Sequence, residues 1–228
     1  PIEQLENFLT LLIVALEKGI LGYINQIENL RLNRAKILAK ILPDNPKVLT
    51  HCNVSGELVA LGLELKKQDR NIEFFVTETR PYLQGARLTA WELAKAGFRV
   101  NLLCDMQAAN VCLKNNISAI VVGSDRSTVN GDIVNKVGTY QLAVIARHFD
   151  IPFYCLTQAP GKTKTIKDIE IEYRNPDEVI KFEGKYFTAK NQKALYPSFD
   201  ITPKEFITKL IFFDGAYTPE EFKAKWKN

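Results

Sequence analysis

Reactive side chains follow directly after two short apolar segments of the chain. Cys52 comes after residues 47–51, and Asp125 comes soon after the apolar run at 119–122. A thiol just ahead of a helix can have a lowered pKa, because the positive end of the helix dipole favours the thiolate. A carboxylate that ends an apolar strand is partly desolvated, which suits it for proton transfer. An inert core cysteine and a helix-capping or ion-paired aspartate are the alternatives.

Candidate anion-binding side chains lie where helices are expected to begin. Asn135 and Lys136 stand just ahead of a helical pattern, where backbone amides, the helix dipole and an ammonium together suit a phosphate. Gln84 and Arg87 likewise stand at the start of a predicted helix. The alternative for the first pair is an N-cap and a solvated lysine. His51 is interpreted as a structural histidine.

The elements that position these residues alternate between strand and helix after Pro46. Short apolar strands are predicted at 47–51, 73–77, 99–104, 118–122 and 152–156, with helices at 56–67, 83–96, 108–114 and 138–149. This alternation predicts an α/β fold, a doubly wound Rossmann-like parallel sheet. Right-handed crossovers bring the carboxyl ends of the strands to one edge, where such folds bind ligands. The candidate residues should therefore meet at that edge.

A helical arm is predicted ahead of the sheet. Apolar residues recur every three or four positions through the first forty residues, and Gly19 and Gly22 are expected to divide this stretch into two helices. We therefore predict a helical arm at 1–42 and a Rossmann-like ligand-binding domain at 43–228. Two late helices are expected from capping boxes that start at Thr202 and Thr218.

Composition narrows the classes of partner. The 228 residues are 46% hydrophobic and 25% charged, with a net charge of +4 and with acids and bases interleaved, so neither nucleic acid nor membrane is expected as a partner. The apolar run at 8–16 is too short to span a bilayer. Four cysteines without paired spacing and two histidines predict reduced thiols, a cytoplasmic protein, and no metal or other cofactor. The first residue is Pro1 rather than Met, which suggests a processed chain or a fragment.

Several motifs together resemble one protein family. They are LTHCN at 49–53, TRPYLQGARLTAWEL at 79–93, VGSDR at 122–126, NGD at 130–132, NKVGTYQLA at 135–143 and PSFDITP at 197–203. These segments resemble the family that contains methylthioribose-1-phosphate isomerase, ribose-1,5-bisphosphate isomerase and the alpha, beta and delta regulatory subunits of translation initiation factor 2B. The resemblance runs from about residue 47 to residue 214, which is most of the chain.

The resemblance implies a function and a role for each candidate. The family's catalytic cysteine and aspartate correspond to Cys52 and Asp125, and its substrate-contacting glutamine and Asn-Lys pair correspond to Gln84, Asn135 and Lys136. It implies an aldose–ketose isomerase that converts the sugar phosphate 5-methylthioribose 1-phosphate in methionine salvage, as a homodimer. The alternatives are a regulatory, sugar-phosphate- or nucleotide-binding module without catalysis, and a ribose-1,5-bisphosphate isomerase.

Two departures from the family pattern bear on activity. The family's isomerases grip phosphate with an Arg-Gly-Ala-Pro loop in an amino-terminal domain, and this sequence contains no such loop. Ser124 stands where the family usually has alanine. We therefore expect a carboxyl-terminal domain preceded only by helices, either as a fragment or as a short member with slow turnover.

Overall fold

A seven-stranded sheet forms the centre of the computed structural model, which describes residues 2–54, 56–161, 163, 165–189 and 191–227. The strand order is β12-β11-β7-β4-β1-β2-β3, and every pairing except that of β12 is parallel. The strands are β1 (Lys47–Thr50), β2 (Glu73–Thr77), β3 (Arg99–Leu103), β4 (Ala119–Val122), β7 (Phe153–Leu156), β11 (Lys209–Ile211) and β12 (Ala216–Tyr217). The six parallel strands follow the doubly wound order, so the predicted fold class is confirmed. The order reverses between β1 and β4, and ligands of such folds bind at this point.

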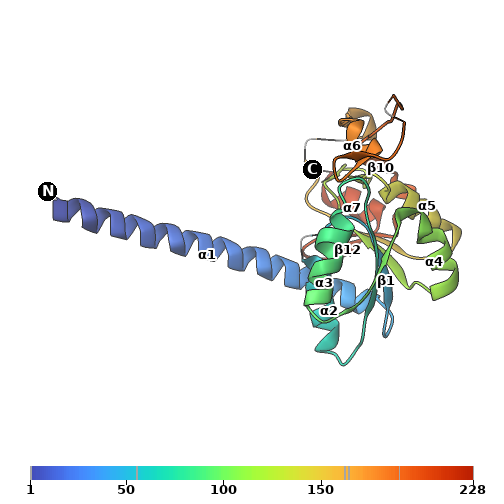
Figure 1. Cartoon of the computed structure of the whole chain (residues 1–228). Coiled ribbons are helices and arrows are strands. Elements are labelled where there is room, and N and C mark those ends of the chain that lie inside the picture. The colour runs from blue at the N-terminus through green and yellow to red at the C-terminus, as the bar shows by residue number, and fades with distance from the viewer. Residues whose placement is uncertain (1, 55, 162, 164, 190, 228) are drawn as a thin grey trace.

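Helices cover both faces of the sheet because its central strands are apolar on both sides (Figure 1). In β4, Ala119 and Val121 belong to one core cluster, while Ile120 and Val122 belong to the other. The first cluster takes in residues of α1 (Ile2–Ile41), α2 and α3, and the second takes in residues of α4, α5 and α7. These helices are α2 (Glu57–Lys66), α3 (Trp91–Lys95), α4 (Ala108–Asn115), α5 (Thr139–His148) and α7 (Pro219–Lys225).

Helix α1 (Ile2–Ile41) is a single helix of 40 residues, so the predicted division at Gly19 and Gly22 is wrong. A helix interior tolerates glycine at a cost of about 1 kcal/mol, and a Cβ added at either glycine would meet no packed neighbour. Only its last turns pack on the sheet, and the rest projects outward (Figure 1). Pro1, where the predicted arm begins, lies outside the described residues. Within those residues, no helix is long and apolar enough to cross a membrane.

Residues 126–136, where no strand was predicted, contain two strands. A second, antiparallel sheet is formed by β5 (Arg126–Ser127), β6 (Ile133–Lys136) and β10 (Phe199–Thr202). All four residues of β6 are buried, including the polar Asn135 and Lys136. Sequence reasoning missed this strand because its partner β10 lies more than sixty residues later, and local patterning carries no signal for such a pairing.

The remaining elements are short. They are the π-helix η1 (Gly85–Ala90), the 3₁₀ turns η2 (Asp105–Gln107), η3 (Ile166–Asp168) and η4 (Lys204–Phe206), α6 (Asp177–Ile180), β8 (Lys181–Phe182) and β9 (Lys185–Tyr186). The capping box at Thr218 is confirmed, since its side chain accepts from the Glu221 amide. The one predicted at Thr202 is wrong, because Thr202 ends β10 and η4 begins after Pro203.

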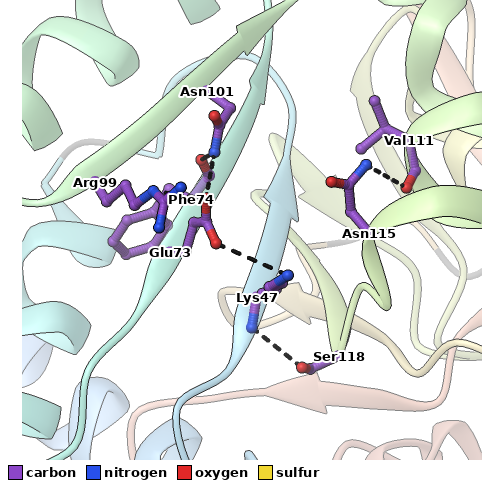
Figure 2. A network of polar contacts seen from close by, with 8 residues as sticks. All are labelled: Lys47, Glu73, Phe74, Arg99, Asn101, Val111, Asn115 and Ser118. Carbon is purple, nitrogen blue, oxygen red and sulfur yellow. Dashed lines mark hydrogen bonds and ion pairs between the residues drawn. The ribbon is translucent and has the colours of Figure 1, made fainter.

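Polar contacts tie the strands together at the amino ends of the sheet (Figure 2). The Glu73 carboxylate accepts from the Asn101 amide at 2.8 Å and pairs with Arg99 at 3.0 Å. The Lys47 backbone amide donates to Ser118 Oγ at 3.1 Å. These contacts join the amino ends of β1, β2, β3 and β4 to one another.

Candidate active site

A cavity of about 670 Å³ opens at the carboxyl ends of β1 and β4, where the strand order reverses. Five of the six predicted site residues line it: Cys52, Gln84, Asp125, Asn135 and Lys136. They come from the ends of three strands and from the residue before η1. Apolar side chains complete the wall, among them Val54, Leu88, Leu156, Phe199 and Phe213. The sheet therefore gathers at one place groups that are far apart in the sequence.

Cys52 follows β1 directly, in a left-handed backbone conformation with φ of 62°. Burial raises the pKa of its thiol, while a hydrogen bond from the Asn53 amide and the charge of Lys136 oppose that rise. The expected lowering of the pKa by a helix dipole is wrong, because α2 begins only at Glu57 and desolvation is the largest effect. The cavity therefore holds a neutral thiol at neutral pH.

Asp125 follows β4 and is held by its backbone amide, which donates to the Val134 carbonyl of β6 at 2.9 Å. Its side chain is exposed to the space of the cavity, yet partial desolvation raises the pKa of its carboxyl, against the charges of Lys136 and Arg126. A raised pKa brings a carboxylic acid nearer to the pH at which it can both give and take a proton. The predicted desolvation of Asp125 is confirmed in direction.

Lys136 is buried in β6, with 7% of its surface exposed, so the alternative of a solvated lysine is wrong. Its ammonium lies 4.7 Å from the centre of the Phe199 ring and 5.9 Å from that of Tyr82. Asn135 donates to Thr139 Oγ1 at 3.0 Å, and that hydroxyl donates to the Lys136 carbonyl at 2.6 Å. These bonds fix the backbone that carries both residues.

Two amide groups at the start of α5 are already occupied. The Asp200 carboxylate accepts from the Gly138 amide at 2.7 Å and from the Tyr140 amide at 3.1 Å. The predicted contribution of this helix end to phosphate binding is therefore wrong, and the cations that the cavity offers an anion are side chains, Lys136 among them. Burial outweighs the two amide donors and raises the pKa of Asp200 to about 6.

His51 has a structural role, as predicted from the sequence. Its Nε2 lies 2.9 Å from the Val137 carbonyl and must donate to it, so Nδ1 accepts from Thr77 Oγ1 at 2.6 Å. Burial lowers the pKa of His51, which favours this neutral form. The ring joins β1 to β2 and to the turn before α5, and it does not line the cavity.

Gln84 and Arg87 have different surroundings. The Gln84 Oε1 atom is buried without a hydrogen-bond partner in the described residues, which leaves an acceptor unsatisfied beside the cavity. Arg87 is exposed and does not line the cavity. The residues after Gln84 form a π-helix, whose wider turn removes the common face that positions three apart have in an α-helix.

A family model described as the initiation factor 2 subunit family matches residues 11–219. The chain belongs to that family. It is 42% identical to methylthioribose-1-phosphate isomerase of Chloroflexus aurantiacus over 82% of this chain and 56% of that protein. It is also 42% identical to the same-named enzyme of Fervidobacterium nodosum, over 87% and 60%. The chain thus spans less than two thirds of the length of these relatives.

Two solved structures of this family are similar to the chain. The 5-methylthioribose 1-phosphate isomerase of Pyrococcus horikoshii has a TM-score of 0.80 and 36% identity, over 86% of this chain and 58% of that one. The delta subunit of translation initiation factor eIF-2B from A. fulgidus has a TM-score of 0.76 and 35% identity, over 83% and 58%. An enzyme and an initiation factor subunit are therefore almost equally similar in fold.

Sequence reasoning missed the cavity wall that α1 supplies in this member of the initiation factor 2 subunit family. Arg31 and Arg34 line the cavity from α1, and Arg34 pairs with Glu57 of α2 at 3.5 Å. The Arg34 guanidinium also lies 4.0 Å from the centre of the Phe213 ring. The available signal was Arg34 itself, a charged residue within the apolar spacing of the helix.

Proposed function

We propose that the chain catalyses the aldose–ketose isomerisation of 5-methylthioribose 1-phosphate to 5-methylthioribulose 1-phosphate, a step of methionine salvage. The observation that carries this proposal is the cavity itself, where Cys52, Asp125 and Lys136 meet from different strands. A thiol, a carboxyl with a raised pKa and a buried ammonium are the groups that proton transfer on a sugar phosphate requires. Similarity to isomerases named for this substrate supports the same reaction.

The chemistry starts from a closed sugar ring. A phosphate on C1 prevents simple ring opening, so the bond between C1 and the ring oxygen breaks while that oxygen takes a proton. Hydrogen moves from C2 to C1, and the C2 hydroxyl loses its proton to become a carbonyl. No atom is gained or lost, and no oxidant is required. The protein must supply one acid, one base and a clamp for the phosphate.

Each role suits one side chain of the cavity. Asp125, whose pKa is raised, gives the proton to the ring oxygen. General acid catalysis of this kind contributes about a hundred- to ten-thousand-fold in rate. Cys52 acts at C2 as the base: its thiolate, a form that the nearby Lys136 ammonium favours, takes the proton that the C2 hydroxyl loses. Lys136, with Asn135 and Gln84, holds phosphate or sugar oxygens.

Turnover by the purified chain is the direct test. We expect conversion of 5-methylthioribose 1-phosphate to the ketose, followed by phosphorus NMR, with ribose 1,5-bisphosphate run in parallel as the competing substrate. A Cys104→Ser variant, which removes an exposed thiol outside the cavity, should turn over like the wild type. Faster conversion of the bisphosphate would reassign the substrate.

A second candidate is a binding module without catalysis, as in the regulatory subunits of the initiation factor. The 35% identity to the eIF-2B delta subunit favours it, because that similarity nearly equals the one to the isomerase. In this case the cavity senses a sugar phosphate or nucleotide. Calorimetry that finds sugar-phosphate binding, together with an absence of turnover under all conditions, would favour the module over the enzyme.

We also propose that the chain works in the cytoplasm as a homodimer, with residues 1–42 as a helical arm and 43–228 as the ligand-binding domain. Four free cysteines and a small charge of +4 support a reducing setting and a sugar-phosphate partner rather than a nucleic acid. Sedimentation equilibrium tests the dimer, and a monomer at micromolar concentration would contradict it.

A further inference from the structure

The backbone at Cys52 has an unusual conformation. Its φ of 62° lies in the left-handed region, which a side chain with a Cβ disfavours. A residue keeps such a conformation only where its surroundings hold it, and such residues gather at functional sites. Hydrogen bonds from neighbouring elements hold Cys52 in this conformation.

Two threonine hydroxyls hold the two sides of this residue. The Cys52 amide donates to Thr79 Oγ1 at 2.9 Å, and Thr89 Oγ1 donates to the Cys52 carbonyl at 2.6 Å. Thr79 follows β2, while Thr89 lies in η1, so the two bonds reach Cys52 from separate elements. Both threonines are buried, which shields the bonds from competing water.

Each threonine is itself fixed. The Asp105 carboxylate accepts from the backbone amides of Thr79 and Arg80, both at 2.8 Å. Helix η1 lies so close to β2 that a Cβ on Gly85 would come 1.8 Å from the Thr77 carbonyl oxygen. Glycine at this position therefore permits the approach that brings Thr89 to Cys52.

We propose that Thr79 and Thr89 are positioning residues that hold Cys52 in the left-handed conformation and so aim its thiol into the cavity toward the reacting carbon. The proposal rests on the proposed function for its effect on turnover. It rests on the geometry alone for its effect on the thiol. Neither threonine lines the cavity, so both act through Cys52.

The test replaces each hydroxyl while keeping the shape of the side chain. Thr79→Val and Thr89→Val remove the hydrogen bonds, and Thr79→Ser and Thr89→Ser keep them. Thr208→Val is a control for the loss of a threonine hydroxyl that accepts from a backbone amide: Thr208, which is exposed, accepts from the Phe153 amide at 2.9 Å, and neither residue lines the cavity. All variants carry Cys104→Ser, so that Cys52 is the accessible thiol; Cys112 and Cys155 are buried.

Two readouts separate positioning from stability. The first is the pH profile of Cys52 alkylation by iodoacetamide, which should shift in both valine variants and stay unchanged in the serine variants and in Thr208→Val. The second is turnover, where kcat should fall about a hundredfold in the valine variants, as for a misplaced catalytic group, while KM changes little. If a valine variant fails to give folded protein by circular dichroism, the alanine variant replaces it.

The outcomes distinguish the two proposals. A shifted alkylation profile without any turnover, even in the wild type, would support the positioning role and refute the isomerase. Folded valine variants that keep the wild-type alkylation profile would overturn the positioning role, whatever the activity. Serine variants that lose as much as the valine variants would overturn it as well, since the hydroxyl would then not be the cause.

Discussion

Replacing Lys136 by methionine should weaken ligand binding and raise the free energy of unfolding of the ligand-free protein. The ammonium is buried and lies against the rings of Phe199 and Tyr82, and in the described part of the chain it forms no ion pair within 4.0 Å. A buried charge without a paired carboxylate is costly, and cation–π contacts return only about 0.5–2 kcal/mol. Methionine keeps the length of the side chain and removes the charge.

The magnitudes follow from these contacts. Loss of a charge-assisted contact costs about 1.5–3 kcal/mol, which is roughly a ten- to hundredfold loss in affinity for a sugar phosphate. Removal of the desolvated ammonium should raise the free energy of unfolding by about 0.5–2 kcal/mol, the usual gain when a functional constraint is relieved. Binding and stability should therefore change in opposite directions.

Calorimetry with 5-methylthioribose 1-phosphate and with inorganic phosphate measures the affinity, and urea unfolding of the empty protein measures the stability. Lys114→Met is the matched control, because Lys114 is exposed on α4 and outside the cavity; it should change neither quantity. Equal affinity in Lys136→Met and wild type would refute the assignment of the phosphate to this lysine. A large loss of stability would refute the view that its charge is unsatisfied.

Three further outcomes are expected. Cys52→Ser and Asp125→Asn should each abolish turnover and leave the affinity measured by calorimetry nearly intact. Both substitutions keep the size and hydrogen bonding of the side chain but remove its proton transfer. A substantial residual kcat in either variant would remove that residue from the mechanism. Arg87→Ala should leave affinity and kcat unchanged, since the side chain lies outside the cavity, and a tenfold loss would restore the role that the sequence suggested for it. Asp200, whose pKa is raised from 3.8 to about 6, stabilises the fold below its unfolded pKa and loses this contribution as the pH rises through about 6. Relative to Asp200→Asn, the wild type should lose about 3 kcal/mol of unfolding free energy between about pH 4 and pH 7, by the usual 1.36 kcal/mol per pKa unit; a constant difference across that range would contradict the raised pKa.

The parallel sheet could be predicted because its signals are local. Apolar runs such as 119–122 alternate with helical spacing, and the handedness of crossovers then fixes where their carboxyl ends meet. That argument placed Cys52 and Asp125 at one edge without knowledge of strand order. The same argument placed Gln84, Asn135 and Lys136 at that edge, and the resemblance to a family added the role expected of each.

The predictions that failed concern hydrogen-bond partners and pKa values, which depend on contacts with distant parts of the chain. The helix end beside Lys136 looked open to a phosphate, but Asp200 comes from β10 to occupy it. Arg87 was expected at the site with Gln84, but it lies in a π-helix and outside the cavity. The thiol pKa looked low from a nearby helix, but burial by residues of other elements raises it. Each error has the same physical origin, since desolvation and hydrogen-bond partners are set by tertiary contacts.

The reversal of strand order between β1 and β4 also ties the site to the folding of the whole chain. After β1 the chain builds β2 and β3 outward to the edge, then returns to pair β4 on the other side of β1, with Val48 opposite Ala119 and Leu49 opposite Ile120. Closing such a long loop is slow and carries an entropic cost before any contact repays it. The thiol and the carboxyl are therefore neighbours only after this closure, so a chain that contains both residues still lacks the site until β4 has paired with β1.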